Sequence, residues 1–127
     1  MGEIYGIGTD IVKIDRIEQM MNRSGDKLAK RILTTTEMAE YTNSQNKVIF
    51  LAKRFAIKEA AAKAFGLGFR QGLAYCHIGL THNETGKPLL VFEQKAAELI
   101  SENAIKGHHV SLSDEVDYAV AFVVLNL

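Results

Sequence analysis

The stretch from Phe50 to Gly66, FLAKRFAIKEAAAKAFG, constrains the fold more than any other part of the sequence. It predicts one uninterrupted helix, which apolar side chains cover nearly all round at about 100° per residue. A helix of this kind is usually buried. Glu59 interrupts the pattern. Its neighbours on the same side of the helix are Val48, Leu51, Ala52, Phe55 and Ala62. A buried charge is costly unless it is paired or binds a metal. Glu59 therefore belongs either to an ion pair with Lys63, one turn later, or to an active site.

The length and composition fit one domain over residues 1–127, with a single hydrophobic core. Hydrophobic residues make up 47% of the chain and charged residues 24%, as in ordinary globular proteins. The formal net charge is +0, so no overall field argues for nucleic acid or membrane partners. The single cysteine, Cys76, excludes an internal disulfide and suits a reducing cytosol. Because the N-terminus also lacks a signal-peptide pattern, we expect a cytoplasmic protein.

The rest of the chain divides into helical and strand-like segments. Glu3–Gly8 predicts a short strand whose glycines allow a close backbone approach or a turn, and Asp10 follows at the junction with a helix. Further helices are predicted at 26–33, 47–65 and 94–105, a cap at 34–37, and strands at 74–80, 89–92, 109–113 and 117–125. The last two strands resemble a hairpin. We therefore expect an α+β fold, with a largely antiparallel sheet packed on the long helix.

Several short motifs are ambiguous when each is taken alone. Asp10 suits a helix N-cap, and Gly86-Lys87-Pro88 suits a hairpin turn. His109 opens an alternating strand, where a hydrogen-bonded scaffold role is commoner than a catalytic one. Gly6-Ile7-Gly8 lacks the third glycine of a dinucleotide-binding motif. None of these motifs assigns a function by itself, but their order along the chain is informative.

Four segments, taken in that order, resemble one known family. They are GIGTDIVKIDRIE at 6–18, FLAKRFAIKEAAAKAFG at 50–66, NETGKP at 83–88 and HVSLSDEVDYA at 109–119. The family is that of the bacterial holo-acyl-carrier-protein synthases, the short type of 4′-phosphopantetheinyl transferase, and the likeness extends from about Ile4 to Val124. It implies an enzyme that transfers the phosphopantetheine arm of coenzyme A to a serine of apo acyl carrier protein in fatty acid biosynthesis. Adenosine 3′,5′-bisphosphate is the other product.

The resemblance also implies roles for individual residues. Asp10 and Glu59 are expected to hold Mg²⁺, while Glu59, Lys63 and His109 are expected to be catalytic. Contacts to coenzyme A are expected from Arg54, Lys58, Lys63, Gly86, Lys87, Pro88 and His109. Mg²⁺ takes about six oxygens, usually with only one or two from carboxylates, which leaves room for the diphosphate of coenzyme A. The acceptor of the serine proton is open between Glu59, a metal-bound water and a group on the partner.

The acyl carrier protein is strongly acidic in this family, so we expect a basic contact surface for it. Positive residues concentrate in the N-terminal third, and Arg16 and Arg23 are the expected contacts. The chain has half the length of the broader-specificity relatives. That implies the homotrimer of the short family, with active sites between neighbouring subunits.

The chain departs from the family pattern at two positions. Asp114 stands where many members have the last His of HVSxSH, and Leu67 stands where the glycine-rich stretch usually has a threonine. Two other functions remain as alternatives. One is a Mg²⁺-dependent hydrolase of coenzyme A that uses the same carboxylates. The other is a non-catalytic oligomeric binding module, in which Glu59 and Lys63 form a structural ion pair.

Overall fold

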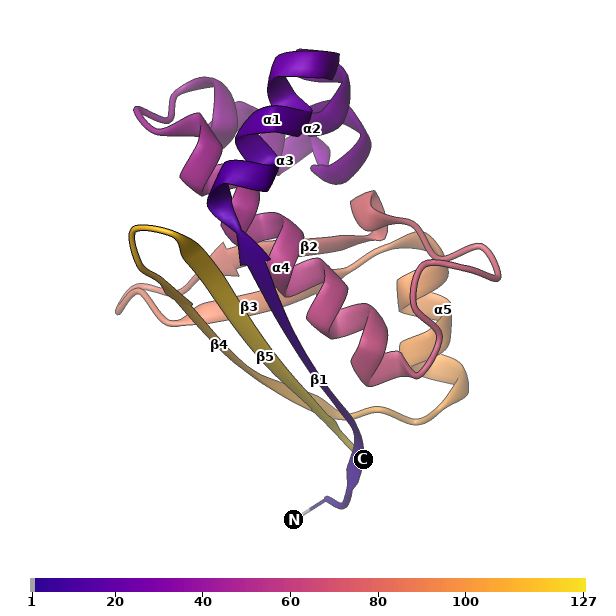
Figure 1. Ribbon diagram of the computed structural model, residues 1–127. Coiled ribbons are helices and arrows are strands. Elements are labelled where there is room, and N and C mark those ends of the chain that lie inside the picture. Colours follow the sequence, from indigo (N-terminus) through magenta and orange to yellow (C-terminus); the bar gives the residue numbers. More distant parts are fainter. Residues whose placement is uncertain (1) are drawn as a thin grey trace.

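The structure, a computed structural model, describes residues 2–127 and confirms the α+β class (Figure 1). The helices are α1 (Ile14–Ser24), α2 (Asp26–Ile32), α3 (Thr35–Thr42), α4 (Lys47–Phe65) and α5 (Gln94–Glu102), with a 3₁₀ helix η1 (Tyr75–His77). The strands are β1 (Ile4–Lys13), β2 (Ile78–His82), β3 (Pro88–Phe92), β4 (Gly107–Asp114) and β5 (Tyr118–Asn126). Within residues 2–127, no helix combines the length and the apolar composition that crossing a membrane requires.

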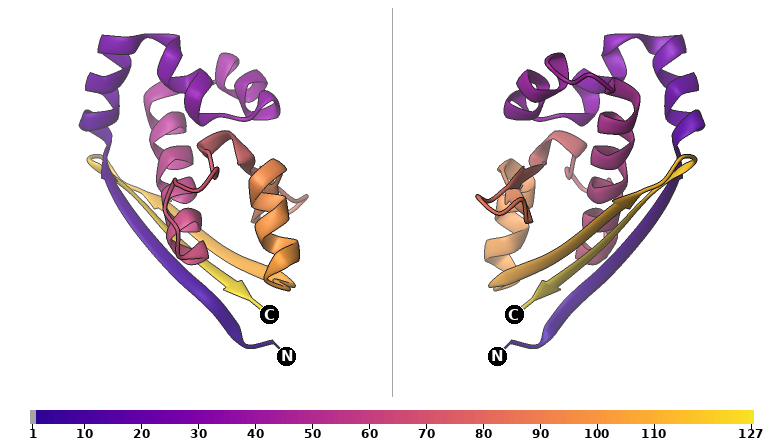
Figure 2. Two further views of the ribbon diagram at one scale, coloured as in Figure 1. Left: turned by 90° about the vertical axis from the view of Figure 1, so that its right-hand side faces the viewer. Right: turned by 90° about the vertical axis from the view of Figure 1, so that its left-hand side faces the viewer.

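The strands form two antiparallel sheets rather than the one sheet that the sequence suggested. One sheet has the order β1-β5-β4 and the other pairs β2 with β3. The predicted hairpin is confirmed, since β4 pairs with β5 along its whole length. The three-stranded sheet curves along α4, and α4 lies between β1 and α5 (Figure 2). Helices α1, α2 and α3 gather at one end of this arrangement, while both termini lie at the other (Figure 1).

Helix α4 has the bounds that the sequence predicted. At its start, Asn46 accepts a hydrogen bond from the backbone N–H of Ile49 at 3.0 Å, which caps the helix. At its end, Gly66 adopts a left-handed conformation with φ of 84°. Leu51 and Ile57 are fully buried, along with most of the alanines. The prediction of a buried helix, made from the apolar residues on nearly all sides of α4, is therefore confirmed.

Two glycines allow β1 to lie directly on α4. A Cβ atom at Gly6 would stand 2.0 Å from the carbonyl oxygen of Ala64, and one at Gly8 would stand 1.9 Å from that of Ala60. No side chain fits in such a space, so only glycine permits this backbone contact. The expectation that these glycines serve a close approach is confirmed.

Strand β1 is longer than the sequence predicted, and this changes the position of Asp10. Asp10 lies inside β1, opposite Ala121 of β5, and α1 begins only at Ile14 with Lys13 as its N-cap residue. The strand continues because its pairing with β5 runs without a break from Gly6 to Lys13. The interpretation of Asp10 as a helix N-cap is therefore wrong. Its side chain is available for another role.

The contact between β1 and α4 can be tested with Gly8→Ala. Because the added methyl group would collide with backbone rather than with a movable side chain, we expect the free energy of unfolding to fall by at least about 2 kcal/mol. Chemical denaturation measures this loss. Gly79→Ala is the matched control in another strand, since its Cβ would meet the methyl carbon of Thr34 at 3.3 Å, where a side chain can yield. Equal losses in the two variants would contradict the backbone contact.

Candidate active site

Asp10 and Lys63 meet where β1 crosses α4. The Lys63 amine donates a hydrogen bond to Asp10 Oδ1 at 3.1 Å and another to the backbone carbonyl of Thr9 at 2.9 Å. The side chain of Asp10 is mostly buried, whereas that of Lys63 is half exposed. The structure thus brings together two residues that the sequence assigned to one site from distant segments.

Glu59 has a different partner from the one that helical spacing suggested. Among residues 2–127, no ion pair joins Glu59 to Lys63. Instead, Glu59 Oε2 accepts a hydrogen bond from the hydroxyl of Tyr75 at 3.2 Å. The structural ion pair required by the non-catalytic alternative is therefore not formed.

The surroundings of Glu59 set the protonation behaviour of the site. Burial raises the pKa of Glu59 above its ordinary value. The hydrogen bond from Tyr75 opposes this rise, and Asp10 adds to it because its negative charge is close by. Burial and Glu59 together raise the pKa of Tyr75 to about 12, so the tyrosine hydroxyl remains a donor at neutral pH. Because the negative charge of Asp10 disfavours the charged form of Glu59, a cation beside these two carboxylates would be stabilised.

The donor atoms at this place suit Mg²⁺. Asp10 and Glu59 offer hard carboxylate oxygens, which Mg²⁺ prefers, and it typically takes only one or two of them. No group of three or more His, Cys, Asp or Glu side chains that could hold a metal is found within residues 2–127. A closed cage of protein ligands, as zinc requires in structural sites, is thus not present in this part of the chain.

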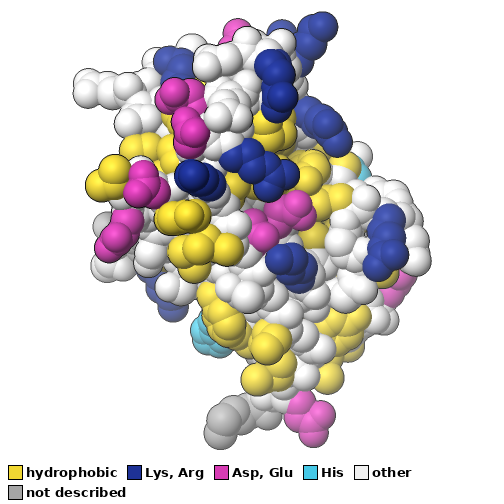
Figure 3. Space-filling view, viewed as in Figure 1, with side chains coloured by type: hydrophobic (Ala, Val, Ile, Leu, Met, Phe, Trp, Pro, Cys, Tyr) yellow, Lys and Arg dark blue, Asp and Glu magenta, His cyan; other side chains and the backbone are white. Residues whose placement is uncertain are grey.

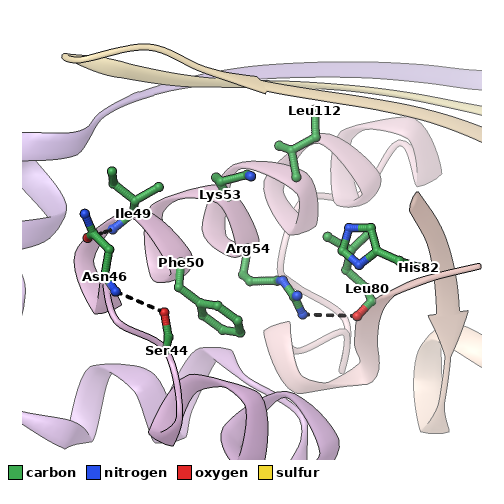
Figure 4. Close-up of a pocket in the computed structure, with 9 residues that line it drawn as sticks. All are labelled: Ser44, Asn46, Ile49, Phe50, Lys53, Arg54, Leu80, His82 and Leu112. Carbon is green, nitrogen blue, oxygen red and sulfur yellow. Dashed lines mark hydrogen bonds between the residues drawn. The ribbon is translucent and has the colours of Figure 1, made fainter. Parts of the chain in front are cut away.

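A hollow of about 260 Å³ lies beside α4 (Figure 4). It is on a different side of this helix from Glu59. Its wall includes Lys53 and Arg54 of α4, His82 of β2 and Leu112 of β4. Arg54 and Glu59 are about 140° apart around the helix axis, because they are five positions apart in the helix. Within one chain, the hollow and the carboxylates therefore open on different sides of α4.

Arg54 and Lys58 both bind the buried carboxylate of Glu37. Arg54 Nη1 donates to Glu37 Oε2 at 2.9 Å and to the carbonyl of Leu80 at 3.0 Å. The Lys58 amine donates to Glu37 Oε1 at 2.6 Å and to the carbonyl of Ile32 at 2.7 Å. Arg54 still lines the hollow, but Lys58 is fully enclosed. The prediction that Lys58 contacts coenzyme A is wrong. Its side chain has no exposed surface, and its amine donates its hydrogen bonds to groups in the protein core.

The proposed Gly86-Lys87-Pro88 contact lies in the turn between β2 and β3. Gly86 has a positive φ of 86°, and the Asn83 side chain accepts hydrogen bonds from Thr85 and Lys87 within the turn. Pro88 stands opposite His82, which lines the hollow of Figure 4. The turn that the sequence predicted is confirmed, and it lies beside the hollow's rim.

His109 lies on the face of the three-stranded sheet that points away from α4. It stands opposite Val124 of β5, which stands opposite Ile7 of β1, and directly opposed residues share a face. Ile7 is 57% exposed, whereas Asp10 shares its face with the buried Ala121 beside α4. A single chain therefore does not bring His109 to Asp10.

The basic residues lie on the exposed surfaces of α1 and α2. Figure 3 shows Lys and Arg side chains gathered over the end of the molecule that these helices form. The exposed members in this region are Arg16, Arg23, Lys27, Lys30 and Arg31. Arg16 adjoins the site, since it and Met20 line a second hollow of about 210 Å³ together with Glu59 and Tyr75. Arg23 lies in the last turn of α1.

The sequence did not predict the roles of two residues in this region, Tyr75 and Glu37. Tyr75 was assigned to a strand, and nothing in its local pattern indicates a contact with Glu59. Glu37 was assigned to a helix cap, and the capping box with Thr34 is present. The pairing of Glu37 with two residues of α4 depends on tertiary packing that the local pattern does not contain.

The comparisons with known proteins identify the family of the chain. A family model described as the 4′-phosphopantetheinyl transferase superfamily matches residues 6–123. The holo-[acyl-carrier-protein] synthase of Pectobacterium atrosepticum is 54% identical over 122 residues, which are 96% of this chain and 97% of that protein. The chain belongs to the holo-[acyl-carrier-protein] synthase family of 4′-phosphopantetheinyl transferases. The resemblance read from the sequence motifs is confirmed, and the chain is an enzyme of this family.

Solved structures of holo-[acyl-carrier-protein] synthases have the same fold. The crystal structure of the Neisseria meningitidis synthase matches with a TM-score of 0.93 at 42% identity, covering 97% of this chain and 98% of that chain. The Bacillus anthracis synthase, in complex with coenzyme A (3′,5′-ADP), matches with a TM-score of 0.80 at 34% identity, covering 97% of this chain and 96% of that chain.

Asp114, which we expected from the resemblance to depart from the common pattern, has a partner in this chain. It forms an ion pair with Lys53 at 3.4 Å, with both side chains about one-third exposed. An exposed pair of this kind contributes little stability. Its consequence is local, because it holds Lys53 at the wall of the hollow in Figure 4.

The buried cluster around Glu37 predicts a pH-dependent stability. Burial alone would raise the pKa of Glu37, but the charge and hydrogen bond of Lys58 and two backbone N–H groups lower it below its ordinary value. A lowered pKa means that the stabilisation is present above the unfolded value of 4.5 and is lost as the pH falls through the folded value. We expect Glu37→Gln to reduce the free energy of unfolding by about 3 kcal/mol at neutral pH. The difference from the wild type should shrink in acid.

Denaturant titrations at several pH values measure this difference. Glu40→Gln is the matched control, because Glu40 binds the same arginine at 3.3 Å but has a side chain that is 44% exposed. We expect this control to cost less than about 1 kcal/mol. A loss in Glu37→Gln that stays constant from neutral to acid pH would contradict the described role of its charge.

Proposed function

We propose that this chain transfers the 4′-phosphopantetheine arm of coenzyme A to a serine of apo acyl carrier protein, in a Mg²⁺-dependent step of fatty acid biosynthesis. The meeting of Asp10, Glu59 and Lys63 at the crossing of β1 and α4 is the observation that carries the proposal. Relatives named for this activity, and the coenzyme A complex of the Bacillus anthracis synthase, support it.

The three residues suit the chemistry of phosphoryl transfer. Asp10 and Glu59 would hold Mg²⁺, which when bound offsets the charge of the diphosphate and polarises the attacked phosphorus. Lys63, held by Asp10 and the Thr9 carbonyl, places a half-exposed positive charge beside the carboxylates. The serine hydroxyl gives its proton to Glu59, to a water or to a group on the partner, and its oxygen forms the new bond to the β-phosphorus of coenzyme A. The bond to the departing adenosine 3′,5′-bisphosphate breaks, and Lys63 stabilises the charge that develops there.

A second copy of the chain is needed to complete this site. The hollow beside Arg54 and the carboxylates open on different sides of α4, and His109 lies on the far face of the sheet. That face is unusually apolar: Ile7, Ile11, Val120 and Phe122 are 57%, 63%, 39% and 43% exposed. Exposed apolar patches commonly mark contacts between proteins. We propose the homotrimer of the short family, in which a neighbour supplies His109 and the hollow with Arg54 and the Gly86-Lys87-Pro88 turn for coenzyme A.

The acyl carrier protein would bind over α1. Arg16 lies next to Glu59 and is exposed, as is Arg23 further along the helix. An acidic partner is attracted to such a surface and is oriented by it. The hollow that contains Arg16, Met20 and Glu59 leads from this surface to the carboxylates. The serine of the carrier would therefore reach the phosphates from the side of α1.

The transfer is tested by mass spectrometry of apo acyl carrier protein incubated with this protein, coenzyme A and Mg²⁺. We expect a mass gain of one phosphopantetheine arm. Asp10→Asn and Glu59→Gln should lower the rate by at least about 100-fold, because each removes a charged oxygen ligand of the Mg²⁺ that would stabilise the transition state. Glu98→Gln, on the exposed surface of α5, is the control and should retain the wild-type rate.

The outcomes separate transfer from the alternatives. Normal turnover in a folded Glu59→Gln protein would refute the metal assignment. Release of adenosine bisphosphate without carrier protein would indicate a hydrolase. If coenzyme A with Mg²⁺ does not raise the melting temperature and no arm is transferred, the proposed transfer is refuted.

The oligomer is tested with Phe122→Glu. A charge in the centre of the apolar sheet face should convert the trimer to smaller species and abolish transfer, because each site then lacks its neighbour. Sedimentation velocity and the transfer assay measure the two effects. Val91→Glu is the matched control, since Val91 is a 42% exposed strand residue of the other sheet. A monomeric Phe122→Glu protein with full activity would contradict a shared site.

A further inference from the structure

Tyr75 contacts the proposed metal site, although its neighbours in the sequence give no sign of it. Its hydroxyl donates to Glu59 Oε2 at 3.2 Å. Within residues 2–127 this is the only hydrogen bond that the Glu59 side chain makes, and Oε1 accepts none. We propose that Tyr75 is a positioning residue for Glu59: its hydroxyl fixes the carboxylate through Oε2 and leaves Oε1 for the cation.

The tyrosine ring is held firmly enough to act as such a support. It stacks on Phe69 with ring centroids 3.8 Å apart and on Phe55 with centroids 5.6 Å apart, at interplanar angles of 26° and 20°. Phe55 lies one turn before Glu59 on α4, on the same side of the helix. The aromatic stack and the carboxylate therefore belong to one rigid surface.

The backbone of Tyr75 is also fixed, through the buried ion cluster. Its carbonyl accepts a hydrogen bond from the Lys58 amine at 3.3 Å. Lys58 is in turn bound to Glu37 at 2.6 Å. Lys58, which does not reach coenzyme A itself, thereby connects the core of the protein to the group that orients Glu59.

The need for this orientation follows from the nature of the side chain. Glutamate has three rotatable bonds, and α4 offers Glu59 no ion pair that would select one arrangement. A hydrogen bond from a fixed neighbour restricts the carboxylate before the cation binds. Partners of metal ligands typically contribute 10-fold to 100-fold in metal affinity. The assignment of Tyr75 rests on the proposed function of Asp10 and Glu59 as metal ligands.

Tyr75→Phe is the decisive variant, because it removes the hydroxyl and retains the ring between Phe55 and Phe69. We expect the Mg²⁺ concentration for half-maximal transfer to rise by about 10-fold or more, with the maximal rate recovered at saturating Mg²⁺. Calorimetric titration of Mn²⁺ into the protein with coenzyme A, without carrier protein, should show the same loss of affinity. The melting temperature without metal should not change.

Tyr5→Phe is the matched control, since Tyr5 is a half-buried tyrosine of β1 whose hydroxyl makes no hydrogen bond within residues 2–127. It should leave both the Mg²⁺ dependence and the Mn²⁺ affinity unchanged. Wild-type values in Tyr75→Phe, beside a wild-type protein that transfers the arm, overturn the positioning role alone. A lower melting temperature with unchanged Mn²⁺ affinity also overturns it, because the hydroxyl is then only structural. A wild-type protein that neither binds Mn²⁺ nor transfers the arm overturns the proposed function and the role of Tyr75 together.

Discussion

The backbone contact between β1 and α4 is the constraint on which the site depends. Gly6 and Gly8 allow the strand to lie against the carbonyl oxygens of Ala64 and Ala60, closer than any side chain would permit. At this distance the Thr9 carbonyl and Asp10 come within reach of the Lys63 amine. If the strand and the helix were further apart, Asp10 on β1 would not reach Glu59 and Lys63 on α4, and the three groups would not form one site.

On the side of α4 that carries Arg54 and Lys58, ion pairs with Glu37 fix the orientation of the helix about its own axis. Glu37 binds Arg54 and Lys58 in the core, and these contacts connect α4 to the start of α3 and to β2. A buried charge of this kind requires complete pairing, and removing one partner is strongly destabilising. The same helix thus has a closed ionic cluster on one side and an open pair of carboxylates near its other side. The open pair would bind a cation that phosphates can reach, whereas in the closed cluster Lys58 is fully enclosed.

The sequence predicted those parts of the structure that depend on local periodicity or on the family resemblance. Helix α4 has the predicted bounds, β4 and β5 form the predicted hairpin, and Asp10 and Lys63 meet as the resemblance implied. The partner of Glu59 was not predictable, since helical spacing places Lys63 nearby but does not reveal that Asp10 holds it or that Tyr75 approaches from η1. Lys58 was misassigned because a lysine beside Glu59 in sequence can point into the core. Its burial is decided by Glu37, a residue of another helix.

A crystal structure of the protein with Mn²⁺ and coenzyme A tests the central claim most directly, because Mn²⁺ is located by its anomalous scattering and takes the oxygen ligands of Mg²⁺. We expect one ion bound by Asp10 and Glu59 of the same subunit at about 2.1 Å, together with diphosphate oxygens of coenzyme A. The adenosine end should lie in the hollow beside Arg54 of a neighbouring subunit. An ion bound elsewhere, with Asp10 and Glu59 free of it, would contradict their role as metal ligands.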